Sequence, residues 1–222
     1  MSTHQRVYYM TSAQHALSNL EHARIKIAEF RDMNDPFECL SADLRNKDLR
    51  RAFAAMRKHF EENRGAICFS RGFRNPVLWS HYADRHRGVC LGFDVKKELL
   101  TPMRYDAKRL PTILETMITG DEKAKLAAIE RVLTTKYRDW KYEDEVRAHA
   151  SIDERDPATG CCFYPLSLDV KLTEVLLGQR FNGDLARFNA VLSKDYPGVR
   201  AQQMRLAFKS FAVVPDLSKA LR

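Results

Sequence analysis

The segment KYRDWKYEDEVRAHA, residues 136–150, combines acids, bases and aromatic residues at a density that packing alone does not require. Four acids fall within seven consecutive positions: Asp139, Glu143, Asp144 and Glu145. Carboxylates gathered in this way can act as general acids or bases, or can stabilise positive charge that develops in a transition state. The secondary-structure elements that carry these carboxylates decide which of these roles they can perform.

The apolar residues that follow the acids recur at every second position, which predicts a strand. They are Val146, Ala148 and Ala150. Glu145 therefore shares the opposite face with Arg147 and His149. A carboxylate on a strand beside a groove is well placed to hold a sugar hydroxyl or to stabilise a cationic transition state. Glu145 is the first candidate for this role and Glu143, on the same face, is the second; the alternative is a solvated strand edge.

A basic loop lies between a predicted strand at residues 66–70 and a predicted short helix. Ser70, Arg71 and Arg74 lie directly before Asn75-Pro76, a typical N-cap followed by proline at the first helical position. Free N–H groups at a helix start bind anions, and a guanidinium adds a bidentate clamp. We therefore expect a phosphate contact here, with Arg74 as its main residue.

The helix after this loop presents Trp79, Tyr82 and Ala83 on one face, at i, i+3 and i+4 spacing. This face either forms the wall of a pocket or packs into the core below solvated arginines. His81 and His86 have no cysteine or carboxylate at metal-ligand spacing, so we expect no metal site.

Two further segments carry polar groups near predicted strand ends. In RVYYMTS, Tyr8 and Tyr9 alternate, so either one packs and one faces a groove, or both pack. NDPFE, residues 34–38, predicts a turn, and we expect Glu38 to cap the positive end of the next helix.

The composition predicts one soluble globular protein. Of the 222 residues, 45% are hydrophobic and 30% are charged, and the formal net charge of +8 permits a polyanionic partner. No apolar run is long enough to span a bilayer and the N-terminus carries no signal peptide, so we expect no membrane association. Five cysteines without a C-x-x-C pair indicate reduced thiols and a cytoplasmic location.

The coarse pattern predicts short strands interleaved irregularly with helices. Helices are expected near 12–20, 42–60, 77–84, 112–119, 121–137 and 184–196, with strands between them. Neither a phosphate-binding glycine loop nor strict βαβ alternation is present. The fold class is therefore α+β, with a mixed curved or split sheet and helices packed around it. We expect a single domain over 1–222, with a core at about 6–208 and a C-terminal tail at 209–222.

Several motifs occur in the order of a known bacterial family: YYMTS…ALSNL, NDPFE, CFS…WSHYADRHRGVCLGFD, DWKYEDEVR and TEVLLG. In these motifs the chain resembles domain of unknown function 2971 over roughly residues 7–180. The resemblance names a family without supplying an activity.

The chain also resembles, more distantly, the NAD-dependent ADP-ribosyltransferase toxins that modify DNA. Tyr9-Met10-Thr11 stands where those enzymes have His-x-Thr, and Arg74-Asn75-Pro76-Val77-Leu78 matches their Arg-x-Pro-hydrophobic-Leu segment. Glu145 matches the glutamate that begins a late strand. The resemblance implies an ADP-ribosyltransferase-like fold, with NAD as substrate and Glu145 and Arg74 as catalytic residues. It further implies that Tyr9, Thr11, Ser70, Trp79 and Tyr82 contact NAD or pack behind its pocket.

The function implied is that of a bacterial toxin or phage-defence effector acting on nucleic acid or protein. Two alternatives stay open: an NAD-independent nucleic-acid-binding or processing protein, and a non-catalytic interaction module. The ADP-ribosyltransferase hypothesis requires the side chains of Glu145 and Arg74, about 70 residues apart, to meet in one cleft. The sequence leaves the oligomeric state and the acceptor undetermined.

Overall fold

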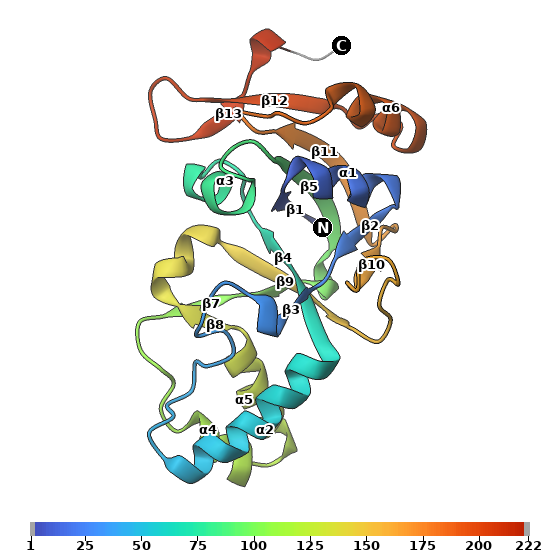
Figure 1. Cartoon of the computed structure of the whole chain (residues 1–222). Helices are drawn as coiled ribbons and strands as arrows, with labels where there is room; N and C mark the ends of the chain where they lie inside the picture. The colour runs from blue at the N-terminus through green and yellow to red at the C-terminus, as the bar shows by residue number, and fades with distance from the viewer. Residues whose placement is uncertain (1–2, 220–222) are drawn as a thin grey trace.

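The computed structural model describes residues 3–219, and its centre is a mixed sheet of nine strands (Figure 1). In pairing order these are β13 (Val213–Pro215), β12 (Ala201–Leu206), β11 (Val170–Leu177), β5 (Val89–Lys96), β1 (His4–Thr11), β4 (Arg64–Ser70), β9 (Glu145–Ser151) and β6 (Thr101–Pro102), with β3 (Ala28–Glu29) added to β4. The β11–β12 pair is parallel and the other pairs are antiparallel.

The sheet splits between β1 and β4. The register of β1 with β5 runs from His4 to Thr11, whereas β1 meets β4 at the single pair Tyr8–Ser70. Beyond that pair the edge of β4 is taken by β3, through Ala28–Ala66. The two halves of the sheet therefore diverge on one side of Tyr8–Ser70, and this divergence makes room for a cavity.

Two small sheets flank the main one. β2 (Arg24–Lys26) pairs with β10 (Phe163–Pro165), and β7 (Arg104–Asp106) pairs in parallel with β8 (Thr135–Tyr137). β8 lies where the sequence predicted the end of a helix at 121–137. That prediction is wrong for the last residues, because the helix ends at Leu133 and the chain continues as a strand.

Six α-helices surround the sheet in the described part of the chain: α1 (Ala13–Glu21), α2 (Lys47–Asn63), α3 (Pro76–Tyr82), α4 (Ile113–Thr119), α5 (Glu122–Leu133) and α6 (Leu185–Asp195). Figure 1 shows α2, α4 and α5 together at one end of the molecule, with α1 and α6 at the other end beside β11. The predicted cap at Asn75 is confirmed, since its Oδ1 accepts a hydrogen bond from Val77 N. Ser12 caps α1 in the same manner, with its Oγ accepting from His15 N.

The largest hydrophobic core lies between the sheet and helices α1 and α6. Val7 and Leu91 from the central strands pack there with Leu20 of α1 and Phe188 of α6, all of them buried. A second core holds Trp79 of α3 against the strands beyond β5. The expected mixed α+β architecture is confirmed.

The C-terminal segment differs from the predicted tail at 209–222. Val213–Pro215 forms β13 antiparallel to β12, and Val213 N donates to Arg74 O at 2.8 Å. Val213 is fully buried, and this burial explains why the segment pairs with the sheet. Residues 220–222 lie outside the described chain.

Candidate functional site

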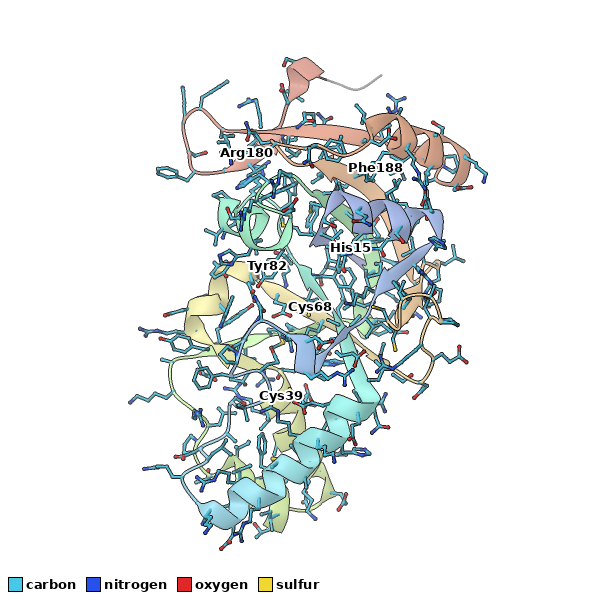
Figure 2. The ribbon with its side chains drawn as sticks, viewed as in Figure 1. His15, Cys39, Cys68, Tyr82, Arg180 and Phe188 are labelled. Carbon is cyan, nitrogen blue, oxygen red and sulfur yellow. The ribbon has the colours of Figure 1, made fainter. Side chains whose placement is uncertain are left out.

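A cavity of about 300 Å³ opens where β1 and β4 separate. β1 contributes Tyr8, Tyr9 and Met10 to its wall, and β4 contributes Cys68, Phe69 and Ser70. Cys68 and Tyr82, both labelled in Figure 2, line it from β4 and α3. Its polar side is formed by Glu38, Tyr82, Lys136, Glu143, Glu145 and Arg147.

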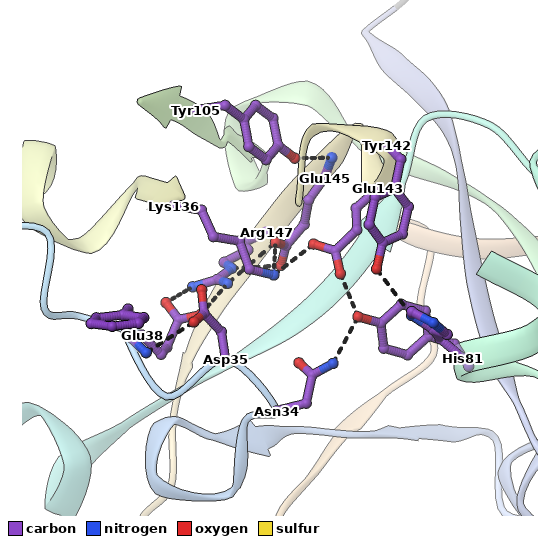
Figure 3. Close-up of polar contacts among 12 residues, drawn as sticks. Asn34, Asp35, Glu38, His81, Tyr105, Lys136, Tyr142, Glu143, Glu145 and Arg147 are labelled. Atoms are coloured by element: carbon purple, nitrogen blue, oxygen red, sulfur yellow. Dashed lines mark hydrogen bonds and ion pairs between the residues drawn. The ribbon is translucent and has the colours of Figure 1, made fainter. Parts of the chain in front are cut away.

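Arg147 is the centre of a buried ion network on that polar side (Figure 3). Its Nε donates to Glu145 Oε1 at 2.6 Å, and its two terminal nitrogens donate to the carboxylate of Glu38 at 2.7 and 2.9 Å. Arg147 is 0% exposed, and both glutamates are buried. A planar guanidinium fits two carboxylates in this way because its five donors form a fixed fork.

Lys136 joins the network from β8. Its Nζ donates to Glu143 Oε2 at 2.6 Å and to Glu145 Oε2 at 3.1 Å. The other oxygen of Glu143 accepts from the Tyr82 hydroxyl, which in turn accepts from Asn34 Nδ2 at 2.9 Å. Burial disfavours the charge on Lys136, but Glu145 and Glu143 outweigh this and raise its pKa, so the ammonium stays charged.

The network holds one carboxylate more than it holds cations. Glu38, Glu143 and Glu145 face Lys136 and Arg147, and all five side chains are buried. Burial raises the pKa of Glu143, and the opposing attraction of Lys136 does not cancel that effect. Burial also acts on Glu145, but Arg147 and Lys136 outweigh it and lower its pKa to about 2. Glu145 is therefore the more strongly stabilised anion of the two, and Glu143 is the carboxyl group that is more easily protonated.

Local backbone geometry aims both glutamates at Lys136. Glu145 and Arg147 lie two residues apart on β9, so their side chains share a face, as predicted. Asp144 connects the preceding 3₁₀ helix, Arg138–Glu143, to β9 with a left-handed φ of 43°, a conformation that Asp tolerates. Arg71 holds this turn from the basic loop, through a 2.7 Å ion pair with the Asp144 carboxylate.

The NDPFE turn presents Glu38 to this network. Asp35 Oδ1 accepts from Phe37 N at 2.9 Å, and Asp35 O accepts from Glu38 N at 3.0 Å. The expectation that Glu38 caps the next helix is wrong, because α2 begins only at Lys47 and both Glu38 oxygens bind Arg147. The interpretation of Glu145 as a solvated edge residue is also wrong, since Glu145 is buried.

The structure brings together some of the predicted site residues and leaves others apart. Glu145, Glu143, Tyr9, Ser70 and Tyr82 line the cavity. Three other predicted residues, Arg74, Thr11 and Trp79, are not part of its lining.

Each of these three residues is absent from the cavity lining for a different reason. Trp79 is fully buried in the second core, with Nε1 donating to Phe73 O at 2.6 Å, so the core interpretation of this helix face is correct for Trp79. Thr11 is buried at the end of β1, opposite Val89. Arg74 is exposed, with its guanidinium 5.9 Å from the Phe73 ring centre. The expected meeting of Arg74 and Glu145 in one cleft does not occur in this cavity.

Three residues on the polar side of the cavity were not identified from the sequence as site residues: Lys136, Glu38 and Arg147. Lys136 fell within a segment expected to be helical, and Glu38 contacts a residue 109 positions away. Cys68 also lines the cavity, but burial raises its pKa well above the usual value, so it remains a thiol rather than a nucleophilic thiolate.

No group of three or more His, Cys, Asp or Glu side chains among residues 3–219 has an arrangement that could hold a metal ion. Within the same residues, no helix combines the length and apolar character needed to cross a bilayer.

These features define an α+β protein with a split sheet and a buried ion network at the split. Residues 78–148 match the model of a family described as protein of unknown function (DUF2971), so the resemblance to that family is confirmed over this segment. The matched segment contains Tyr82, Lys136, Glu143, Glu145 and Arg147. Searches of curated proteins and of solved structures gave no match.

The low pKa of Glu145 predicts how its contribution to stability changes with pH. A glutamate has a pKa of about 4.3 when unfolded, so folding favours the ionised form and Glu145 stabilises the folded state above that pH. This stabilisation is lost as pH falls toward 2. Urea unfolding of wild type and Glu145→Gln should show a difference in free energy that shrinks from pH 6 to pH 3. The exposed Glu154→Gln serves as control, and a pH-independent difference for Glu145→Gln would contradict the assignment.

Proposed function

We propose that this chain is an ADP-ribosyltransferase-like enzyme that takes NAD as its substrate. The observation that carries the proposal is the surplus of buried carboxylate on the wall of the cavity, formed by Glu143 at the end of the 3₁₀ helix and Glu145 at the start of β9. Transfer from NAD passes through a ribose with oxocarbenium character, and a fixed anion beside it lowers the energy of that transition state.

The dimensions and walls of the cavity support a site for the nicotinamide ribose part of NAD. Its volume of about 300 Å³ lies at the lower end of the range for small-molecule sites, so the rest of the dinucleotide would extend outside. Tyr8, Tyr9 and Phe69 provide aromatic walls, and the carboxylates offset the positive charge of the nicotinamide ring. The two cations in the cavity are engaged by carboxylates, and Arg74 is not part of its lining. The proposal therefore gives Arg74 no catalytic role and rests on the carboxylates, with the diphosphate bound by groups outside the cavity.

The site residues would divide the chemistry in the following way. The bond between ribose C1′ and nicotinamide breaks, and nicotinamide leaves with the bonding electron pair. The acceptor nucleophile forms the new bond at C1′, and its proton passes to Glu143. Glu145 keeps Lys136 and Arg147 in place and leaves Glu143 as the carboxyl group that contacts substrate.

Two general features also support this proposal. The split mixed sheet agrees with the ADP-ribosyltransferase-like architecture that the sequence resemblance implies. The net charge of +8 suits a polyanionic acceptor such as nucleic acid, with protein as the other acceptor class.

Release of nicotinamide from NAD tests the proposal, with a cavity-filling variant to locate the reaction. Met33 lines the cavity and is partly buried, so Met33→Trp should obstruct it. We expect wild type to release nicotinamide and Met33→Trp to lose about tenfold or more in kcat/KM, corresponding to roughly 1.4 kcal/mol. Ile118→Trp, at a half-exposed position of α4, is the matched control and should match wild type.

Two results would contradict the proposal. Unchanged NAD in the presence of candidate acceptors would exclude the transferase. Salt-dependent oligonucleotide binding with NAD intact would instead favour an NAD-independent nucleic-acid-binding protein.

A further inference from the structure

A groove lined mainly by cations adjoins the cavity at Lys136, which lines both of them. The groove consists of two neighbouring hollows on the protein surface, and Lys108 and Arg109 line both hollows. Six of its side chains carry a positive charge or an aromatic ring at the surface, and we call this set the basic groove: Phe37, Arg45, Arg50, Lys108, Arg109 and Tyr137.

Two segments of the chain form the walls of the basic groove, and backbone hydrogen bonds join them. One wall is residues 37–50, which lead from the NDPFE turn into α2, and the other is residues 106–111, which follow β7 (Figure 1). Leu110 N donates to Ser41 O at 2.7 Å, and Asp43 N donates to Leu110 O at 3.0 Å. Main-chain contacts therefore fix the distance between the cations of the two walls.

The carboxylates that line the groove are already paired with arginines. Asp43 pairs with Arg45 at 2.7 Å, and Asp106 pairs with Arg131 at 2.6 Å. Three exposed cations of the groove take part in no ion pair among residues 3–219: Arg50, Lys108 and Arg109. A groove with a surplus of one charge raises the local concentration of ions of the opposite charge, so the partner that it fits is a polyanion.

Two aromatic side chains indicate which polyanion the groove fits. Phe37 is 52% exposed and Tyr137 is 45% exposed, and the Arg109 guanidinium lies 5.3 Å from the centre of the Phe37 ring. Single-stranded nucleic acids bind to grooves of this kind, because their bases stack on the rings while cations neutralise their phosphates. An acidic protein segment would pair with the cations but has no bases to stack on the rings.

We propose that the basic groove binds single-stranded nucleic acid. The binding itself does not require NAD, whereas its role in holding the acceptor rests on the proposed function. The NDPFE turn connects the two sites, since Asn34 and Glu38 line the cavity and Phe37 lines the groove. A strand in the groove thus lies beside a turn that forms part of the cavity wall, and nucleic acid rather than protein is the acceptor class.

Fluorescence anisotropy with short labelled single strands of DNA and of RNA tests this binding in the absence of NAD. Lys108→Ala/Arg109→Ala should weaken binding about tenfold or more, and should lower the slope of log Kd against log salt by about 1.4, since each phosphate contact contributes about 0.7. Binding of either strand in this way supports the proposal, and the tighter one identifies the sugar. No binding of either strand at low salt would overturn it.

A second double variant with the same loss of charge is the control. Arg187→Ala/Lys194→Ala removes two cations from α6, which lies at the other end of the molecule from α2 (Figure 1). Their side chains are 58% and 82% exposed, and binding should stay within about twofold of wild type because salt screens distant charges. Equal weakening by the two double variants would overturn the proposal, since net charge alone would then explain the binding.

Variants of Phe37 test the preference for single strands. Phe37→Ala should weaken single-strand binding about fivefold or more with little change in the salt slope, whereas Phe37→Trp keeps a ring and should bind as wild type does. A duplex of the same sequence should bind more weakly than the single strand. Duplex and single strand bound equally well, with Phe37→Ala unchanged, would overturn the proposal. Binding to phosphatidylserine vesicles in place of oligonucleotides would overturn it in favour of a membrane surface.

Nicotinamide release separates this proposal from the proposed function. A wild type that releases nicotinamide but binds no oligonucleotide would overturn the nucleic-acid groove and leave the transferase intact. A wild type that binds single strands through the groove but leaves NAD unchanged would overturn the transferase and retain the groove. Where both activities are present, Lys108→Ala/Arg109→Ala should raise the KM for an oligonucleotide acceptor about tenfold.

Discussion

Arg147→Ala is expected to lower the free energy of unfolding by about 3–5 kcal/mol, because it leaves buried carboxylates without their partner. Glu38 loses both of its hydrogen bonds from Arg147, and Glu145 keeps only Lys136. Glu38 and Glu145 are only 5% and 4% exposed, so solvent compensates little for the lost guanidinium. Urea unfolding followed by circular dichroism measures the loss.

A surface arginine provides the control for this prediction. Arg187 pairs with Glu21 at 2.6 Å, but its side chain is 58% exposed, so Arg187→Ala should cost less than about 1 kcal/mol. If Arg147→Ala does not fold at all, Arg147→Lys keeps the charge but loses the bidentate fork, and it should lie between wild type and the alanine variant. Equal stability of the Arg147 and Arg187 variants would show that the buried network is not a stabilising feature.

This sensitivity follows from how the network joins distant parts of the chain. Glu38 comes from the turn after β3, Lys136 from β8 and Arg147 from β9. Neither the turn at 34–38 nor the three-residue strand β8 buries enough apolar surface to fix its position alone. Ion pairs to Arg147 and Glu145 hold both segments against the split in the sheet. These contacts require charged side chains to lose their hydration, and the same contacts shape the cavity.

Local signals in the sequence predicted the elements of this site well. Alternation of Val146 with Ala148 placed Glu145 and Arg147 on one face of a strand, and the structure confirms it. Asn75-Pro76 correctly marked the start of α3. These signals succeed because strand period and N-cap chemistry are set by residues only a few positions apart.

The contacts between elements could not be predicted in the same way. Nothing near Glu38 indicates that its partner is Arg147, 109 residues later. Arg74 resembled an anion clamp because it precedes a helix, yet its side chain is exposed and its carbonyl accepts a hydrogen bond from Val213 N of β13. Trp79 had the spacing of both a pocket wall and a core face, and only the packing against Met204 and Val213 decides between them.

The two candidate acids, which the strand pattern left undistinguished, have different contacts in the structure. Their pKa values move in opposite directions, since Glu145 contacts two cations while Glu143 contacts only Lys136. Pairs of titratable groups with diverging pKa values identify which one exchanges protons and which stays charged. The opposite directions of these two pKa shifts lead to the prediction for Glu143→Gln.

Glu143→Gln is expected to lower kcat for nicotinamide release by about 10²–10⁴-fold, the range for loss of a positioned proton-transfer group. Its stability at pH 7 should stay within about 1 kcal/mol of wild type, because the amide oxygen can still accept from Lys136, the amide nitrogen can donate to the Tyr82 oxygen, and the surplus charge is gone. Glu145→Gln should instead lose stability together with activity, because it weakens the hold on both Arg147 and Lys136.

Rates and urea unfolding of the two variants, measured side by side, distinguish these roles. A stable, inactive Glu143→Gln beside a destabilised Glu145→Gln would support Glu143 as the group that contacts substrate. The reverse pattern, with Glu145→Gln stable and inactive and Glu143→Gln fully active, would assign the reacting carboxylate to Glu145. In that case the surplus charge on Glu143 could not be the origin of catalysis.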